Sequence, residues 1–137
     1  KSDLILKSLS ESNGIIGFSL YPHHLKNGSE CKLHEFCEMI AKTADIMGVK
    51  NIGIGSDLCQ DQPDSVVEWM RNGRWTKQKD FGEGNIDNPG FPKQPEWFKD
   101  NSDFQNIKSG LQNIGFSKEN IKDLMGRNWL NFFKKSF

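Results

Sequence analysis

The sequence predicts an α/β fold that forms part of a (β/α)8, TIM-type barrel, with two parallel strands plus helices. Three observations lead to this prediction: an apolar run at residues 15–21, an alternating Ile/Gly run at residues 49–57, and an amphipathic helical pattern between them. A strand, a helix and a second strand in this order form a right-handed parallel unit. A complete barrel of this type needs about 250 residues. We therefore expect residues 1–137 to form a single partial domain, the C-terminal portion of a barrel.

The elements of the first half have separate signals. Residues 3–12 predict a short helix, and the first strand follows between Gly14 and Pro22. Ser29 is a candidate N-cap for the next helix, which Gly48 ends. The apolar stripe of that helix recurs at steps of three and four residues and is formed by Leu33, Phe36, Cys37, Ile40, Ala41, Ala44 and Met47. This stripe should cover the outer face of the two strands.

The second half begins with a long connection at residues 59–102, which is rich in Gly, Pro and aromatic residues. A long connection inside a compact domain is usually functional or disordered, and this aromatic content argues against disorder. We predict an ordered active-site or interface loop with one short helix near residues 64–71. The loop suits a substrate lid or an oligomer contact. Trp69-Met70-Arg71 and Arg74-Trp75 have the residue types of an interface anchor, and a pocket wall is the alternative.

The end of the chain, from Asp103, predicts two or three helices. Ser117 is the candidate N-cap of one that ends at Gly126. The last helix has an apolar face that we expect to be buried in the core, formed by Trp129, Leu130 and Phe133.

Composition excludes some partners. Lys plus Arg and Asp plus Glu number 18 each, so no net charge favours nucleic acid or an anionic membrane. No apolar run is long enough for a membrane span. Cys31, Cys37 and Cys59 lack the paired spacing of a structural zinc site and are predicted to be reduced thiols. The chain starts at Lys1 rather than Met, so we expect a soluble protein whose N-terminus is missing, and a cytoplasmic or a periplasmic location both stay open.

Asp57 is the strongest candidate for chemistry. Side chains alternate along a strand, so Gly53, Gly55 and Asp57 share one face, opposite Ile52 and Ile54. Because bulky aliphatics suit the side that meets the helices, the glycine face should point to the barrel axis. Asp57 then lies at the C-terminal mouth, where barrel enzymes place catalytic groups. A carboxylate that caps the following loop fits the same spacing, and both roles stay open here.

The other polar residues give weaker signals. His23 and His24 follow Pro22 at the same edge, but adjacent side chains diverge and no third ligand lies at suitable spacing, so we predict a solvated loop rather than a metal site. His34, beside the apolar stripe, is predicted to be a packing histidine. Cys59 is predicted to be a buried thiol. No residue of this chain is assigned as a metal ligand.

Three segments together resemble the membrane (renal) dipeptidase family of zinc metallopeptidases. They are Asn-Ile-Gly-Ile-Gly-Ser-Asp at residues 51–57, the strand at residues 14–22, and the tail from Gly115-Phe116-Ser117 to Asn128-Trp129-Leu130. The resemblance covers nearly the whole chain and implies a metal-dependent hydrolase-like barrel that holds two zinc ions and hydrolyses dipeptide amide bonds with a metal-activated hydroxide. The family's ligands are a His-x-Asp pair, a bridging Glu and two histidines, all upstream of the matching segment. We therefore expect this chain alone to hold no zinc and to be catalytically incomplete.

The resemblance also implies residue roles. The carboxylate that ends the family's last barrel strand matches Asp57, which would accept the nucleophile's proton, pass it to the leaving amine and bind the substrate's ammonium group. Tyr21, on the glycine face of the first strand, is a candidate substrate-binding residue, with a packing tyrosine at the barrel rim as the alternative. Many members continue Phe-Asp-Gly where this chain has Leu58-Cys59-Gln60, which leaves the substrate open.

A second functional hypothesis is a non-catalytic, oligomerising barrel remnant or interaction module. Half a barrel leaves strand edges open, and open edges invite association. Under either hypothesis we expect a homo-oligomer, or association with the missing N-terminal part of the same barrel.

Overall fold

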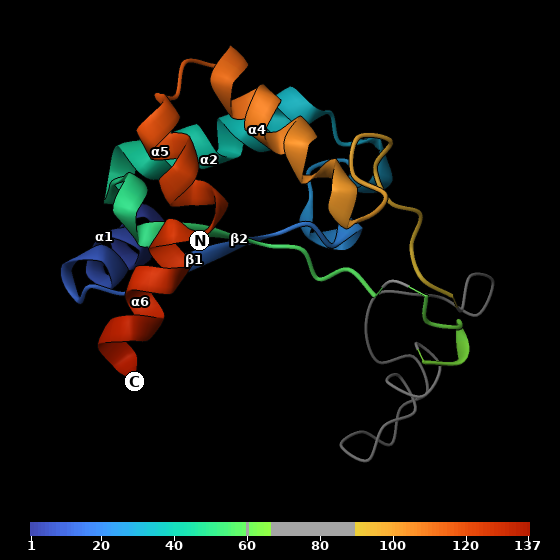
Figure 1. The fold of residues 1–137 in the computed structure, drawn as a ribbon, viewed down its shortest axis with the longest axis horizontal. Helices are drawn as coiled ribbons and strands as arrows, with labels where there is room; N and C mark the ends of the chain where they lie inside the picture. The colour runs from blue at the N-terminus through green and yellow to red at the C-terminus, as the bar shows by residue number, and fades with distance from the viewer. Residues whose placement is uncertain (60, 67–89) are drawn as a thin grey trace.

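The computed structural model describes residues 1–59, 61–66 and 90–137. Its elements follow the predicted order, with a helix before the first strand, a helix between the strands, and helices at the end (Figure 1). The helices are α1 (Asp3–Glu11), α2 (Leu33–Met47), α4 (Phe104–Asn113), α5 (Lys118–Lys122) and α6 (Asn128–Ser136), and the strands are β1 (Ile16–Ser19) and β2 (Ile52–Gly55). None of the helices in the described ranges has the length and apolar character that crossing a membrane requires.

The two strands pair in parallel, as predicted, with Ile16 opposite Ile52 and Ser19 opposite Gly55. Both are shorter than the runs that the sequence indicates: the 3-10 helix Val49–Asn51 forms the start of the second run, and the 3-10 helix Pro22–His24 begins soon after the first strand ends. The pairing extends one residue beyond β1, where Leu20 N–H donates to the Gly55 carbonyl over 3.1 Å. The strand ends that carry the candidate residues are therefore held side by side.

The aliphatic face of this pair packs on α2. Ile52 and the α2 residues Phe36 and Ile40 are fully buried. The rings of Phe18 and Phe36 meet edge to face at 6.1 Å. Figure 1 shows α2 and α4 above the strands and α6 below them. The prediction that the aliphatic face of the strands packs against the helix between them is therefore confirmed.

The glycine face is covered at one end by α6. A Cβ on Gly53 would lie 2.2 Å from Trp129 Nε1, and one on Gly17 would lie 3.0 Å from the same indole ring. Trp129 Nε1 also donates to the Ile54 carbonyl over 3.1 Å. A Cβ on Gly55 would meet no described atom within 4 Å. Gly53 is therefore required for the close approach of the indole ring, whereas the face is open at Gly55.

Two local predictions differ from the structure. Ser29 lies in the 3-10 helix Gly28–Glu30 and does not cap α2, which begins at Leu33. The Glu35 carboxylate takes that role by accepting the Lys32 backbone N–H over 2.9 Å. His34 is exposed rather than packed, because it lies beside the apolar stripe on the outward side of α2. The Ser117 cap is confirmed, since its hydroxyl accepts the Asn120 N–H over 3.2 Å.

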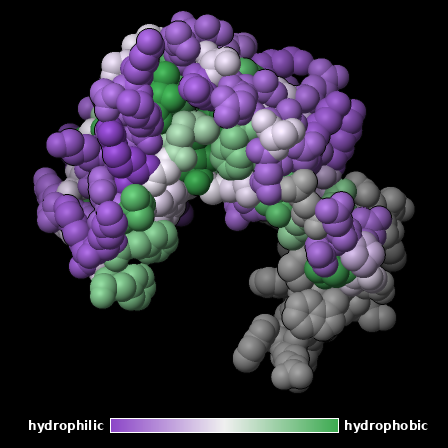
Figure 2. Space-filling view, in the orientation of Figure 1, coloured by the Kyte–Doolittle hydropathy of each residue, from purple (hydrophilic) through white to green (hydrophobic). Residues whose placement is uncertain are grey.

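The prediction that the apolar face of the last helix is buried is wrong for two of its three residues. Leu130 and Phe133 are 53% and 49% exposed, and the terminal Phe137 is fully exposed. Trp129 is half-buried against the strands. Figure 2 shows the resulting apolar surface around the C-terminal end of α6. The spacing of these residues identifies an apolar face of the helix but does not show which surface, if any, covers that face.

The segment predicted as an aromatic loop ends within the core. Trp97 Nε1 donates to the Cys31 carbonyl over 2.7 Å, and its ring packs on Phe36 at 5.3 Å. Phe98 is fully buried. Trp69, Trp75 and most of the helix predicted near residues 64–71 lie outside the described residues. The proposed role of this loop as a lid or an interface stays a prediction.

Candidate active site

The C-terminal ends of β1 and β2 bring a carboxylate, a hydroxyl and an imidazole together. Asp57 follows β2 by two residues, is exposed, and has a backbone φ of 50°. Positive φ is uncommon for residues other than glycine, and such backbones cluster at functional sites. The carboxylate turns back toward β1, where Oδ2 accepts the Ser19 hydroxyl over 2.5 Å.

A capping role for Asp57 would direct its carboxylate to the backbone of the following loop. The described hydrogen bond within that turn is instead made by Ser56, whose hydroxyl accepts the Leu58 N–H over 3.4 Å. Asp57 is bonded to the neighbouring strand. This bond ties Asp57 to β1, and the catalytic role of Asp57 stays a prediction.

Ser19 and His24 were not predicted as site residues. Ser19 Oγ lies 2.9 Å from His24 Nδ1 and accepts the Tyr21 backbone N–H over 3.1 Å. His23 and His24 are both exposed, as expected for a solvated loop, yet His24 is also linked through Ser19 to Asp57. Ser19 could have been found, because it shares the glycine face of β1 with Gly17. His24 could not have been found in this way, because no sequence pattern marks the turn that brings its side chain back to Ser19.

Tyr21 lies where its strand position predicts, near Asp57. Its half-buried ring packs against His23 and His24, with ring centroids 5.6 and 5.5 Å apart. Tyr21 and Asp57 line one open cavity of about 410 Å³, together with Cys59, Phe91 and Lys99. Cys59 is exposed, so the prediction of a buried thiol is wrong. A substrate-binding role for Tyr21 stays a prediction.

The described residues do not fit a zinc site. Within residues 1–59, 61–66 and 90–137, no three His, Cys, Asp or Glu side chains are grouped so that they could hold a metal ion. Cys31 and Cys37 are buried free cysteines, and burial raises the pKa of the Cys37 thiol to about 11. A thiol with a raised pKa is a poor metal ligand at neutral pH, since thiolates bind zinc. That this chain holds no catalytic zinc by itself stays a prediction.

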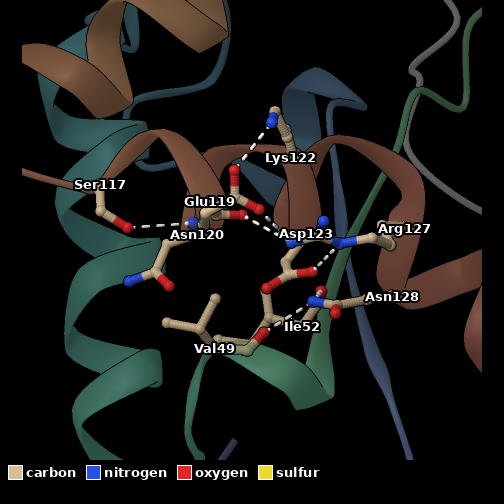
Figure 3. A network of polar contacts seen from close by, with 9 residues as sticks. All are labelled: Val49, Ile52, Ser117, Glu119, Asn120, Lys122, Asp123, Arg127 and Asn128. Atoms are coloured by element: carbon tan, nitrogen blue, oxygen red, sulfur yellow. Dashed lines mark hydrogen bonds and ion pairs between the residues drawn. The ribbon is translucent and has the colours of Figure 1, made fainter.

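The opposite, N-terminal end of the strands carries a structural network (Figure 3). Asn128 is 4% exposed, and its Nδ2 donates to the Val49 and Ile52 carbonyls, each over 2.7 Å. Arg127 pairs with Asp123 and Glu119 on the surface beside it. These contacts fix the start of α6, which places Trp129 on the glycine face.

Comparisons with known proteins agree on the fold. No protein-family model matches the chain, and no curated protein matches it significantly. A solved amidohydrolase from Pseudomonas aeruginosa is similar over 96% of this chain and 38% of its own, with 25% identity and a TM-score of 0.80. A metallopeptidase from Rhodobacter sphaeroides, bound to a phosphinate mimic of the dipeptide L-Ala-D-Ala, is similar over all of this chain and 31% of its own, with 15% identity and a TM-score of 0.69. A metallopeptidase described as dipeptidase AC is similar over 94% of this chain and 30% of its own, with 16% identity and a TM-score of 0.64.

These similarities define the class of fold to which the chain belongs. The chain has the fold of part of a metallo-dipeptidase or amidohydrolase barrel, and it spans about a third of the length of each solved relative. The fold that the resemblance to the membrane dipeptidase family implies is confirmed. Two of these solved structures are described as metallopeptidases.

Proposed function

We propose that this chain is part of a zinc-dependent dipeptidase and that Asp57 is its catalytic acid and base. One observation carries the proposal: Asp57 lies at the open, C-terminal end of the glycine face, with its carboxylate held by Ser19. Barrel enzymes place their catalytic groups at this end of the strands. The fold shared with metallo-dipeptidases supports the reaction class.

Hydrolysis of a dipeptide needs a group that moves one proton. Asp57 would accept a proton from the attacking water as the new C–O bond forms, and would give it to the amine nitrogen as the C–N bond breaks. A positioned acid or base of this kind contributes about 10²- to 10⁴-fold to the rate. Bound zinc lowers the pKa of water and polarises a carbonyl. Its ligands would have to come from outside the described residues, which do not form a metal site.

The cavity beside Asp57 suits a small substrate. Its volume of about 410 Å³ falls in the range of about 300–1,000 Å³ typical of small-molecule sites. The Asp57 carboxylate would attract the substrate's ammonium group, and the Tyr21 ring would form one wall. The turn at Leu58 and Cys59 lines the same cavity, so its departure from the family pattern is expected to alter which dipeptides fit.

The test is Asp57→Asn in a protein that carries this chain within a complete, zinc-loaded barrel. Asparagine keeps the shape but cannot take the proton, so we expect kcat to fall by roughly 10²-fold or more. Zinc content by elemental analysis and the unfolding midpoint should stay unchanged. Asp45→Asn, a change at an exposed carboxylate of α2, is the matched control and should leave kcat unchanged. A loop-capping Asp57 would give the opposite pattern, with stability lost and turnover per folded molecule retained.

A second candidate, a non-catalytic oligomerising module, is favoured by the exposed side chains of Leu130, Phe133 and Phe137. Apolar patches of this kind mark interaction surfaces when they are contiguous. The same preparation separates the two candidates. A folded, zinc-loaded protein that hydrolyses no member of a dipeptide panel would favour the module over the enzyme.

A further inference from the structure

The Ser19 hydroxyl is the centre of three polar contacts at the candidate active site. It lies 2.5 Å from Asp57 Oδ2, 3.1 Å from the Tyr21 backbone nitrogen and 2.9 Å from His24 Nδ1. A serine hydroxyl has one hydrogen to donate and two lone pairs that accept. Three partners therefore use its full capacity.

Counting hydrogens fixes the direction of each bond. An ionised carboxylate only accepts, so the single Ser19 hydrogen points to Asp57. A backbone N–H only donates, so Tyr21 occupies one Ser19 lone pair. The remaining lone pair can only accept, which requires His24 to carry its hydrogen on Nδ1. The bonds then run in one direction, from His24 through Ser19 to Asp57.

The backbone brings these three residues together from separate elements. Ser19 ends β1 opposite Gly55, where an added Cβ would meet no described atom within 4 Å. The positive φ of Asp57 turns its carboxylate toward β1. The 3-10 helix Pro22–His24, closed by the His24 N–H bond to the Tyr21 carbonyl over 2.9 Å, returns the imidazole to Ser19. The Tyr21 ring packs against that imidazole.

We propose that Ser19 is a positioning residue for Asp57, and that His24 orients the Ser19 hydroxyl by donating from Nδ1. The Asp57 side chain is exposed, and without Ser19 it would sample several rotamers. A hydroxyl fixed by two other partners selects one of them and points Oδ2 at β1. The catalytic consequence rests on the proposed function, whereas the hydrogen-bond chain itself does not.

The first experiment reads the histidine tautomer in the 137-residue chain. Long-range ¹H–¹⁵N spectra at pH 8 show which ring nitrogen of each imidazole carries the hydrogen. We expect the Nδ1–H form for His24 and the usual Nε2–H form for the exposed His23 and His34, which serve as internal controls. Ser19→Ala should return His24 to the usual form, and Ser19→Thr, which keeps the hydroxyl, should retain Nδ1–H. An Nε2–H His24 in the wild type, or a tautomer unchanged by Ser19→Ala, would overturn the proposal.

The second experiment measures kinetics in the complete, zinc-loaded barrel. Ser19→Ala should lower kcat by roughly 10- to 100-fold with little change in KM, because a misplaced catalytic group costs about this much. Ser19→Thr should restore most of the loss. In a protein that already carries Asp57→Asn, adding Ser19→Ala should not lower kcat further, since Ser19 acts through Asp57. Equal losses from Ser19→Ala in both backgrounds would overturn the positioning role.

The two experiments separate the two proposals. A His24 tautomer that depends on Ser19, together with an Asp57→Asn protein of normal activity, would support the hydrogen-bond chain and refute the catalytic role of Asp57. An ordinary His24 tautomer would refute the chain whatever the activity of Asp57→Asn.

Discussion

The two ends of the paired strands share one glycine face but differ in how that face is covered. At the N-terminal end, the Trp129 ring fills the space above Gly17 and Gly53, and the buried Asn128 bonds to two backbone carbonyls. At the C-terminal end, a Cβ on Gly55 would meet no described atom within 4 Å, and Asp57 is exposed with a positive φ. The difference follows a general property of barrels, in which one end of the strands provides stability and the other carries chemistry. Substitutions at the N-terminal end should therefore act on folding.

The largest effect on stability is expected from Asn128→Asp. Aspartate has the same shape but replaces the Nδ2 donor with an oxygen that faces the carbonyls of Val49 and Ile52. An uncompensated buried charge typically costs about 3–5 kcal/mol, and protonation relieves only part of this cost. We expect the free energy of unfolding, measured by urea denaturation followed by circular dichroism, to fall by about 3 kcal/mol or more.

Asn131→Asp is the matched control, because it adds the same charge at an exposed position of α6. It should change stability little, as surface substitutions usually do. Equal losses from the two variants would show that Asn128 is not a specific anchor for α6.

A smaller effect is expected from Gly53→Ala, and it tests the difference between the ends directly. The added methyl group would overlap the Trp129 ring and displace the Nε1 bond to the Ile54 carbonyl. Overpacking of this kind costs about 1–3 kcal/mol. Gly55→Ala makes the same chemical change two residues later, where the methyl group meets no described atom within 4 Å. It should be neutral or slightly stabilising, since alanine restricts the unfolded chain.

Urea denaturation of both variants measures the difference in stability, and the NMR resonance of the Trp129 indole N–H reports whether that ring moves. A Gly53→Ala protein as stable as Gly55→Ala would mean that the indole ring does not constrain the glycine face. A larger loss of stability in Gly55→Ala than in Gly53→Ala would show that the tight contact lies at the C-terminal end of the strands instead.

The sequence predicts the parts of this structure that depend on local periodicity. The alternation of Ile52 and Ile54 with Gly53 and Gly55 identifies both faces of the strand, and it places Asp57 at the open end. It does not reveal why Gly53 must be glycine, because Trp129 reaches it from 76 residues further along the chain. The link from His24 to Ser19 depends on a short 3-10 turn that no periodicity marks.

The burial of the last helix was mispredicted for a related reason. The spacing of Leu130 and Phe133 shows that they share a face, but burial depends on what lies opposite that face. Where the partner surface is distant in sequence, a helical pattern predicts only an apolar surface. Trp129, with its contact to Gly53, is the part of that face for which the described chain supplies a partner.

The smallest effect is expected from Glu119→Gln, in the surface part of the network beside Asn128. Hydrogen bonds from Lys122 and then Arg127 lower the pKa of the Glu119 carboxyl from its ordinary 4.5. A carboxyl with a lowered folded-state pKa stabilises the folded state above its unfolded-state pKa, and this contribution is lost as pH falls through the folded-state value. The difference in unfolding free energy between wild type and Glu119→Gln should be small at pH 7, because Glu119 is 62% exposed and solvent screens its ion pairs. It should shrink below about pH 4.5, where the carboxyl becomes protonated. High salt should also reduce it, because salt screens exposed charges. Urea denaturation between pH 3 and pH 7 measures it, with the exposed Glu38→Gln on α2 as the control for loss of a negative charge. A difference that persists at pH 3, or that Glu38→Gln reproduces, would show that the ion pairs of Glu119 do not contribute, and that Asn128 and Trp129 hold the N-terminal end without them.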